Sequence, residues 1–286
     1  MGWVESLQKT IDFMEDHLLE QIQIEEIARQ ANISVSHFQR IFTALTDMSV
    51  GEYIRRRRLT LAAHELSRTG QKIIDLAFKY GYETPEAFAK AFRRQHGITP
   101  SEARGYSGNL TSYNRLVIQV NLKGADPMNV RMVERKGFKV AGIKREFSYA
   151  NGENQAGIPK MWDEVNANGL DDVLFKINEG EIKGVLGVCV DKPSEKGAFM
   201  DYWIAAEVER DSPDELLQLD IPSSKWAVFE VNGPMPHAMQ DMWKKIYSEW
   251  FPSSGFEPAS TPSLEVYSAG NANGADYYSE IWIPVK

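Results

Sequence analysis

A segment of about fifty residues occurs twice in the first third of the chain, as IEEIARQANISVSHFQRIFTALTDMSVGEYI and IIDLAFKYGYETPEAFAKAFRRQHGITPSEAR. Phe38 and Phe42 of the first copy recur 50 residues later in the second. Each copy predicts a short apolar helix, a break at Asn32 or Gly81, and a second helix with aromatic side chains four residues apart. Asn and Gly both tolerate the left-handed backbone that a tight turn between helices requires. The repeat therefore predicts two helix-turn-helix units.

The segment between the copies, GEYIRRRRLTLAAHEL, follows one uninterrupted helical pattern. Such a helix would hold the two units at a fixed separation. Two units on a rigid helix can reach successive major grooves on one side of a DNA duplex, about 34 Å apart, without dimerisation. The alternative is a plain helical bundle whose charged side chains are only solvated. A second copy in register with the first favours DNA binding, so double-stranded DNA is the expected partner.

The side chains expected to contact DNA lie on the second helix of each copy and on the helix between the copies. In the first copy the aromatic residues face inward, which leaves Ser36, Gln39 and Arg40 exposed. Arginine suits guanine edges and glutamine suits adenine edges, whereas lysine and helix N-termini suit phosphates. The four consecutive arginines at 55–58 point in different directions on a helix, so we expect only one or two of them to touch DNA. The candidate DNA-binding residues are Ser36, His37, Gln39, Arg40, Arg55, Arg57, Thr84, Glu86, Lys90 and Arg94.

The charge of the chain is distributed unevenly. The net charge is −8, but residues 1–106 contain 14 basic and 14 acidic side chains, so the remainder carries the whole negative surplus. Between residues 29 and 104 the balance is 13 basic against 7 acidic residues. A basic segment joined to an acidic one indicates a DNA-binding part and a part with a different role.

After a polar segment at 107–114, which we expect to be a linker, the pattern changes to short β-branched and aromatic runs bounded by turn-forming residues. Two amphipathic helices interrupt these runs, around IPKMWDEVNAN and PHAMQDMWKKIYSEWF. The order strand, helix, strand, strand occurs twice, which predicts an antiparallel sheet with both helices on one face and an open groove on the other. The expected fold class is therefore α followed by α+β: an all-α double helix-turn-helix domain at 1–106 and a duplicated βαββ domain at 115–286.

The stretch TPSLEVY places Glu265 and Tyr267 on one face of a strand and two apolar residues on the other. If the apolar residues meet the helices, the carboxylate and the phenol line the helix-free groove. A groove with carboxylates among aromatic rings suits a flat or cationic organic molecule, whereas the alternative is an exposed sheet face with glutamates in cross-strand pairs. The candidate ligand-binding residues are Glu265, Tyr267, Trp203, Phe199, Tyr278, Glu280 and Trp282. Three other tryptophans are assigned to the core: Trp162, Trp243 and Trp250.

Residues 1–106 resemble the DNA-binding domain of AraC/XylS-type transcription regulators. The second copy of the repeat carries that family's signature in Ile74, Ala77, Gly81, Tyr82, Phe88, Phe92, Gly97, Thr99 and Pro100. The chain from about Val130 to Lys286 is similar to the GyrI-like effector-binding domain, in GIPKMWDEV, YWIAAEV, PSLEVY and EIWIPV. In that family a groove glutamate on the strand that corresponds to LEVY is associated with hydrophobic, often cationic ligands. The resemblance implies this role for Glu265.

We therefore expect a bacterial transcription regulator that binds promoter DNA and senses a small amphipathic or cationic organic effector, of the multidrug or stress-response type. RNA polymerase is a further expected partner, and activation is the expected mode, with repression left open. The alternatives are a small-molecule hydrolase, with Glu265 or Glu280 as general base and Tyr267 orienting water, or a ligand-free interaction module. No enzymatic activity, cofactor or metal is expected. The single cysteine and the lack of a secretion signal or membrane-length apolar run indicate a cytoplasmic protein without membrane contact.

Overall fold

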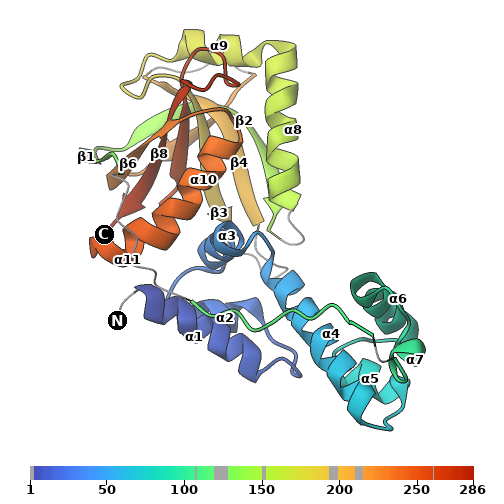
Figure 1. The fold of residues 1–286 in the computed structure, drawn as a ribbon. Helices are drawn as coiled ribbons and strands as arrows, with labels where there is room; N and C mark the ends of the chain where they lie inside the picture. The colour runs from blue at the N-terminus through green and yellow to red at the C-terminus, as the bar shows by residue number, and fades with distance from the viewer. Residues whose placement is uncertain are drawn as a thin grey trace. The chain divides into compact units, whose positions relative to one another are not determined.

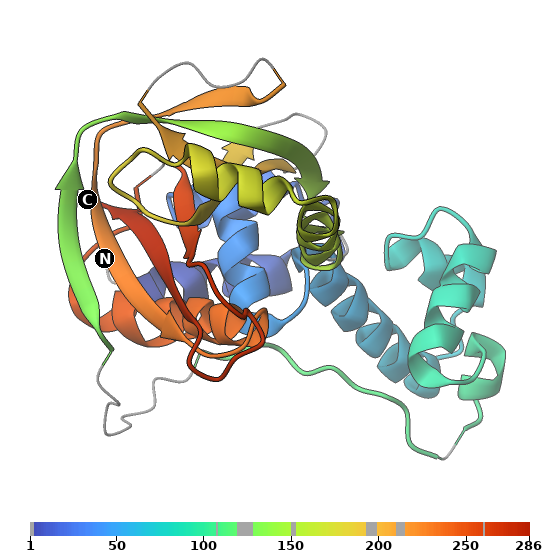
Figure 2. The same cartoon turned by 90° about the horizontal axis from the view of Figure 1, so that it is seen from above.

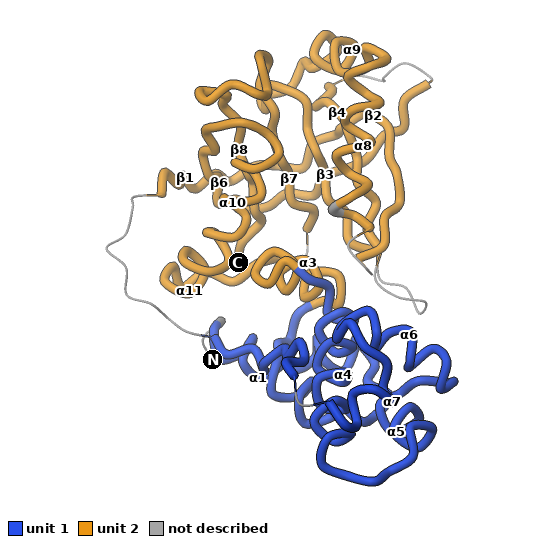
Figure 3. The backbone as a smooth tube through the Cα atoms, turned by 45° about the vertical axis from the view of Figure 1, so that its right-hand side comes forward, with its two compact units in different colours: residues 1–33, 48–120 blue, residues 34–47, 121–286 orange. Residues whose placement is uncertain are grey.

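The computed structural model describes residues 3–106, 108–118, 128–149, 153–192, 199–209, 215–259 and 261–286. Contacts within the chain divide it into two compact units, which Figure 3 shows in different colours. Unit 1 comprises residues 1–33 and 48–120, and unit 2 comprises residues 34–47 and 121–286. The second helix of the first repeat thus groups with the C-terminal part of the chain. Of the linker expected at 107–114, Ser107 lies outside the described residues.

Unit 1 consists of helices among its described residues. These helices, drawn in Figure 1, are α1 (Trp3–Asp16), α2 (Ile24–Gln30), α4 (Val50–Arg68), α5 (Ile73–Lys79), α6 (Pro85–His96) and α7 (Pro100–Ala103). Phe88 and Phe92 of α6 are fully buried in one apolar cluster with Leu66 and Leu76. The aromatic pair of the second repeat therefore faces inward, as the sequence predicts.

Both breaks predicted inside the repeats have left-handed backbone, with φ of 54° at Asn32 and 80° at Gly81. A Cβ atom at Gly81 would lie 2.5 Å from Nη1 of Arg58, so glycine serves both the backbone and the packing here. Arg58 in turn donates hydrogen bonds to the carbonyl oxygens of Leu18 and Glu20, at 2.6 and 2.7 Å. Arg58 therefore has a structural role, because it ties the helix between the repeats to the segment that contains Leu18 and Glu20.

Unit 2 contains one helix from the N-terminal repeat and all the described strands. Its elements are α3 (Val35–Thr46), β1 (Val130–Arg135), β2 (Phe138–Ser148), α8 (Glu153–Asn168), α9 (Leu170–Ile177), β3 (Val185–Lys192), β4 (Phe199–Val208), β5 (Leu217–Ile221), β6 (Ser224–Asn232), α10 (His237–Lys245), the π-helical turn η2 (Ile246–Trp250), α11 (Phe251–Ser254), β7 (Ser263–Tyr267) and β8 (Tyr278–Val285). None of the described helices in either unit combines the length and apolarity needed to cross a membrane.

The described strands form one antiparallel sheet in the order β1-β6-β8-β7-β3-β4-β2-β5. The predicted duplication is confirmed, because β2, β4 and β3 in one half mirror β6, β8 and β7 in the other. The halves meet where β3 pairs with β7, with Gly187 opposite Glu265 in the register. β5 is an additional edge strand that the sequence analysis did not predict.

The two faces of the sheet are both covered, and this corrects the expected open groove. One face packs against α8 and α9 through a cluster that includes Met161, Leu174 and Tyr202. The other face buries a second cluster in which Val140 and Trp282 come from opposite halves of the sheet. The sheet is strongly curved, as the view in Figure 2 shows, and this curvature lets residues far apart in strand order meet. The helix-free face is therefore an apolar core rather than a ligand groove.

Candidate functional site

A cavity of about 690 Å³ lies within unit 2, on the face of the sheet that carries the helices. Its walls come from α3, α8 and α10 and from strands β3, β4 and β7 at the junction of the two halves. Seven aromatic residues contribute to the lining: Tyr149, Trp162, Phe175, Tyr202, Trp243, Tyr267 and Tyr277. A concave site that combines aromatic rings with placed polar groups is a usual form of a small-molecule pocket.

Glu265 lies on the wall of this cavity and accepts three hydrogen bonds. Trp243 donates its indole N–H to Oε1 at 2.9 Å, while the hydroxyls of Tyr202 and Tyr267 donate to Oε2 at 2.8 and 3.0 Å. Trp162 extends this network by donating to the Tyr202 hydroxyl at 3.0 Å. Its ring also packs against that of Tyr267, with centroids 4.6 Å apart. Four aromatic side chains thus fix the position of one carboxylate.

The neighbouring strand leaves room for this network because Gly187 stands opposite Glu265. A Cβ atom at Gly187 would collide with the Tyr202 hydroxyl and lie 3.0 Å from Oε2 of Glu265. The absence of a side chain here lets the hydroxyl and the carboxylate approach each other above β3.

The electrostatic environment of Glu265 differs from that of the rest of the cavity, whose lining includes the cationic side chains of Arg40 and Lys244. Among the residues that the structure describes, no Lys, Arg or His side chain lies within ion-pair distance of Glu265. Burial, followed by the charge of Glu265, raises the pKa of the hydroxyls of Tyr202 and Tyr267 well above the usual value, so both stay protonated and neutral. Burial and the same carboxylate also raise the pKa of the Cys189 thiol. The negative charge of Glu265 is therefore hydrogen-bonded but not neutralised.

The structure brings only two of the predicted ligand-binding residues into this cavity, namely Glu265 and Tyr267. The other five lie on the opposite face of the sheet: Trp203, Phe199, Tyr278, Glu280 and Trp282. The register explains the correction, because Val266 pairs with Glu280 and Leu264 pairs with Trp282. Glu280 is instead ion-paired with Arg131 at 2.8 Å and accepts the indole N–H of Trp282 at 2.7 Å.

The sequence analysis missed three aromatic residues that contact the network around Glu265. Trp162 and Trp243 were assigned to the core, but both line the cavity. Tyr202 is not among the candidate ligand-binding residues, which instead include Trp203, its neighbour on the other face of β4. One signal could have found the two tryptophans: they occupy matching places in the two halves of the duplicated domain, so both point toward the junction of the halves.

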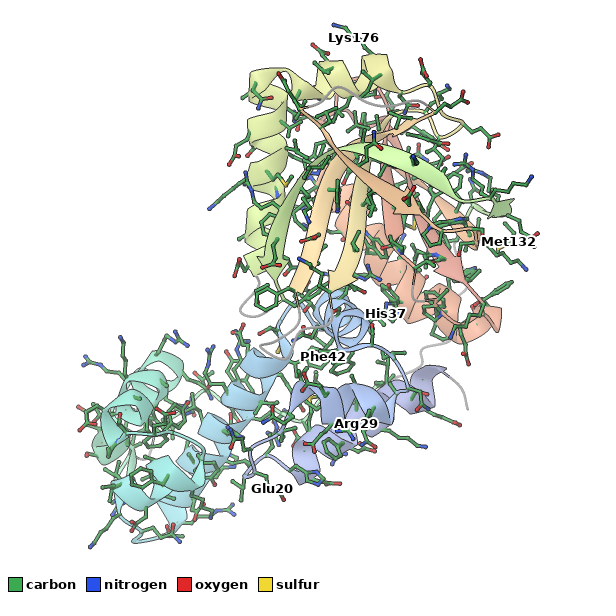
Figure 4. All side chains as sticks on the ribbon, turned by 180° about the vertical axis from the view of Figure 1, so that it is seen from behind. Glu20, Arg29, His37, Phe42, Met132 and Lys176 are labelled. Carbon is green, nitrogen blue, oxygen red and sulfur yellow. The ribbon has the colours of Figure 1, made fainter. Side chains whose placement is uncertain are left out.

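The first repeat also departs from expectation, because α3 lies in unit 2 with its polar side chains covered. Ser36 and His37 are 2% and 7% exposed, and Oε1 of Gln39 and Nε of Arg40 are fully buried. Figure 4 labels His37 and Phe42 on this helix. The predicted exposure of Ser36 is therefore wrong, and Gln39 and Arg40 are only partly exposed. The physical reason is the packing of α3 against α10, η2 and β3.

The second repeat presents its predicted DNA-binding residues to solvent. Thr84, Glu86, Lys90 and Arg94 are all exposed on α6. Thr84 caps the helix, with its hydroxyl accepting from the amide of Ala87 at 3.1 Å. The exposed surface of α6 also carries Arg93 and Arg94 in its last turn, and the positive end of the helix dipole lies at Thr84.

The two arginines predicted on the connecting helix differ from each other. Arg57 is only 12% exposed and forms an ion pair with Glu15 at 2.8 Å, and it also donates to the carbonyl oxygen of Tyr113. It therefore holds unit 1 together and is not a free phosphate contact, which corrects the prediction for this residue. Arg55 is 34% exposed and lies 3.6 Å from Glu52.

Within the described ranges, no cluster of three or more His, Cys, Asp or Glu side chains is arranged to hold a metal ion.

Residues 131–285, more than half of the chain, match the family described as integron-associated effector binding protein. The chain belongs to this effector-binding family. Residues 27–106 match a helix-turn-helix domain, so this effector-binding protein also carries an AraC-type DNA-binding region, and the resemblance stated for both halves is confirmed.

The curated relatives of this effector-binding protein match its N-terminal part. The HTH-type transcriptional activator AarP of Providencia stuartii is 36% identical over 112 residues, which are 39% of this chain and 81% of AarP. The regulatory protein SoxS of Salmonella typhimurium is 36% identical over 104 residues, which are 36% of this chain and 97% of SoxS. The Bacillus subtilis regulator YbfP is 41% identical over 112 residues, but the match spans only 38% of its length.

Two solved structures match the C-terminal part. A bacterial transcription regulation protein from Staphylococcus aureus is 27% identical with a TM-score of 0.50, and it aligns over 56% of this chain and 99% of its own. The structure of SAV2435 bound to tetraphenylphosphonium has the same identity and TM-score, and aligns over 56% of this chain and 94% of its own. The effector-binding fold is thus shared with a protein that holds an organic cation.

Proposed function

We propose that this chain is a ligand-responsive transcription regulator whose helix-turn-helix region binds promoter DNA and whose cavity binds a bulky aromatic or amphipathic organic cation. The observation that carries the ligand half is Glu265, a carboxylate on an aromatic cavity wall with three neutral donors and no described basic partner. Rings and an unneutralised carboxylate together attract a cation that has a large apolar surface. The cation held by SAV2435 has this chemistry.

The DNA half of the proposal is supported by α6 and by the relatives. Lys90 and Arg94 are exposed on the helix that the second repeat predicts as a reader, and the exposed Thr84 caps the N-terminus of that helix. AarP is a transcriptional activator, and activation through contact with RNA polymerase is our proposal for this chain as well. A promoter target places the protein in the cytoplasm.

We propose no enzymatic role. Each oxygen of Glu265 already accepts a hydrogen bond from a fixed aromatic side chain, which leaves it poorly placed to take a proton from water. Tyr267, the group that would orient water in a hydrolase, donates to Glu265 instead. Binding is the activity that this arrangement favours.

The test is the affinity of the full chain for tetraphenylphosphonium, measured by isothermal titration calorimetry for the wild type and Glu265→Gln. The substitution keeps the shape and removes the charge, so we expect the dissociation constant to rise at least about ten-fold, as for loss of a partly desolvated charge contact. Glu280→Gln is the matched control, because it removes a carboxylate from the opposite face of the same sheet. If Glu265→Gln binds the cation as tightly as the wild type does, the proposed role of this carboxylate is wrong.

A further inference from the structure

The helix that the sequence predicts as the first DNA reader, α3, covers part of the cavity that contains Glu265. It contacts α10, η2 and β3, and Figure 1 shows it at the ends of the strands between α8 and α10. Four of its residues line the cavity: Arg40, Thr43, Ala44 and Asp47. A helix expected to read DNA thus forms one wall of the ligand site.

Arg40 joins α3 to the residues around Glu265. Its Nη1 donates to the hydroxyl of Ser263 at 2.8 Å, two residues before Glu265 on the same face of β7. Its guanidinium lies 5.6 Å from the ring centroid of Trp243, whose indole N–H is bonded to Glu265. The guanidinium of Arg40 therefore already lies beside the indole of Trp243, whose N–H positions the carboxylate of Glu265.

The surroundings hold the guanidinium without neutralising it. Nη2 lies 3.0 Å from Nδ1 of His37, while Nε is buried without a hydrogen-bond partner among the described residues. No described carboxylate lies within ion-pair distance of Arg40. Burial lowers the pKa of the guanidinium, but the electrostatic influence of Tyr247 and then Asp191 outweighs burial, so the pKa lies well above its usual value. The guanidinium is thus held by hydrogen bonds and by charges further away rather than by an ion pair, so no ion pair of Arg40 has to break when α3 leaves this position.

The far end of α3 is held by one exposed ion pair. Asp47, which ends the helix in a left-handed conformation, lies 2.7 Å from Nζ of Lys244 on α10. Exposed pairs of this kind contribute little to stability. The helix is therefore held by its packing against α10, η2 and β3, by Arg40 near its middle, and by a weak exposed pair at its end.

We propose that Arg40 is an internal competitor of the effector, so that a cation bound beside Glu265 expels Arg40 and releases α3 to read DNA. A second cation beside Trp243 and Glu265 would be repelled by the Arg40 guanidinium, and in a partly desolvated cavity this repulsion is weakly screened. We call α3 seated when it is packed against α10, η2 and β3, as it is in this structure. In the seated state Ser36 and His37 are buried and Arg40 is bonded to Ser263, so these side chains are unable to contact bases. The effector and the seated helix thus exclude each other. This inference rests on the proposed function and adds the means of regulation.

The experiment measures the affinity of the full chain for tetraphenylphosphonium in three variants beside the wild type. Arg40→Ala removes the competitor, and we expect it to bind the cation about ten-fold more tightly, because the wild type must first unseat α3. Asp47→Asn keeps Arg40 but weakens the anchor, and about three-fold tighter binding is expected. Arg93→Ala, an exposed arginine of α6, is the matched control and should leave the affinity unchanged.

Hydrogen exchange of the wild type provides a readout that does not depend on any substitution. At a saturating concentration of tetraphenylphosphonium, the amides of residues 35–46 should lose protection by about ten-fold, whereas those of residues 85–96 should not change. Equal affinities for the wild type, Arg40→Ala and Asp47→Asn, with α3 protection unchanged by ligand, would overturn the inference.

The two proposals fail in different ways. If only the internal competition is wrong, Glu265→Gln still weakens cation binding while Arg40→Ala binds as the wild type does. If the proposed ligand site is wrong, Glu265→Gln binds the cation unchanged. Absence of binding by both the wild type and Arg40→Ala would overturn both proposals.

Discussion

At the scale of single residues, the site depends on how closely two polar groups approach over one strand. Tyr202 and Glu265 come from strands on either side of β3, and their hydrogen bond passes above Gly187. The glycine has no special function of its own, but any side chain there would occupy the space of the Tyr202 hydroxyl. The hydrogen bond between Tyr202 and Glu265 thus depends on the absence of a side chain at Gly187.

We expect Gly187→Ala to separate Tyr202 from Glu265 and to lower the free energy of unfolding by about 1–3 kcal/mol, the usual cost of overpacking. Urea unfolding measures the stability, and the affinity for tetraphenylphosphonium reports on the site. Gly51→Ala is the control, since a Cβ there meets no atom within 4 Å and lies in the helical backbone of α4. That substitution should be neutral or slightly stabilising. A fully stable Gly187→Ala variant with unchanged ligand affinity would contradict the role given to this glycine.

At the scale of elements, α3 is the part whose properties most differ from those expected of a helix in a repeat. Its predicted counterpart, α6, exposes the equivalent polar side chains, while α3 covers them against the effector-binding fold. The difference lies in what each helix packs against, because both have the same inward aromatic spacing. α3 is thus the element through which a ligand could act on DNA binding.

The stability of the seated state of α3 should depend on pH through His37. Burial, followed by the charge of Arg40, holds the pKa of this imidazole well below the usual 6.5, so the seated helix needs neutral His37. When α3 is released, the pKa of His37 returns toward the usual value. The seat is therefore fully stable above about pH 6.5 and weakens as the pH falls, by up to about ten-fold per pH unit. The groups that face His37 are Arg40 on α3 and Tyr247 on η2.

Hydrogen exchange of residues 35–46, corrected for the intrinsic rate at each pH, measures this effect between pH 7.5 and 5.5. Protection should fall in acid for the wild type. It should stay constant for His37→Asn, whose side-chain oxygen replaces Nδ1 as the acceptor for Arg40 but does not titrate. Equal acid sensitivity in the two proteins would mean that another group controls the seat.

At the scale of the whole molecule, the chain joins an effector-binding fold to an AraC-type DNA-binding region with the opposite charge balance. The acidic surplus lies entirely beyond residue 106, so the net charge of −8 says little about affinity for DNA. Phosphate contacts must come from the basic side chains of the N-terminal region, of which Lys90 and Arg94 are exposed on α6.

Binding of the whole chain to its promoter should therefore weaken steeply with salt, because each phosphate contact releases counterions. We expect Lys90→Ala to reduce the slope of log affinity against log salt by about one unit, since one phosphate contact is lost. Arg57→Ala should leave that slope unchanged and instead lower the stability, because Arg57 is paired with Glu15. Gel-shift titrations between 50 and 200 mM salt, with thermal melts of each variant, distinguish these effects. A slope altered by Arg57→Ala and not by Lys90→Ala would contradict the assignment.

The sequence alone determined the features that depend on local spacing. The helix-turn-helix repeat, the breaks at Asn32 and Gly81, the duplicated βαββ order and the choice of Glu265 and Tyr267 all follow from periodicity and residue type. Only the tertiary structure decided which face of β7 meets the helices, and hence that Trp162, Tyr202 and Trp243 surround the carboxylate. Alternation along a strand assigns residues to two faces but does not say which face is covered, and here the curvature of the sheet buries both. The burial of Arg40 was also decided by tertiary packing, because helical periodicity locates an exposed face without showing what will cover it.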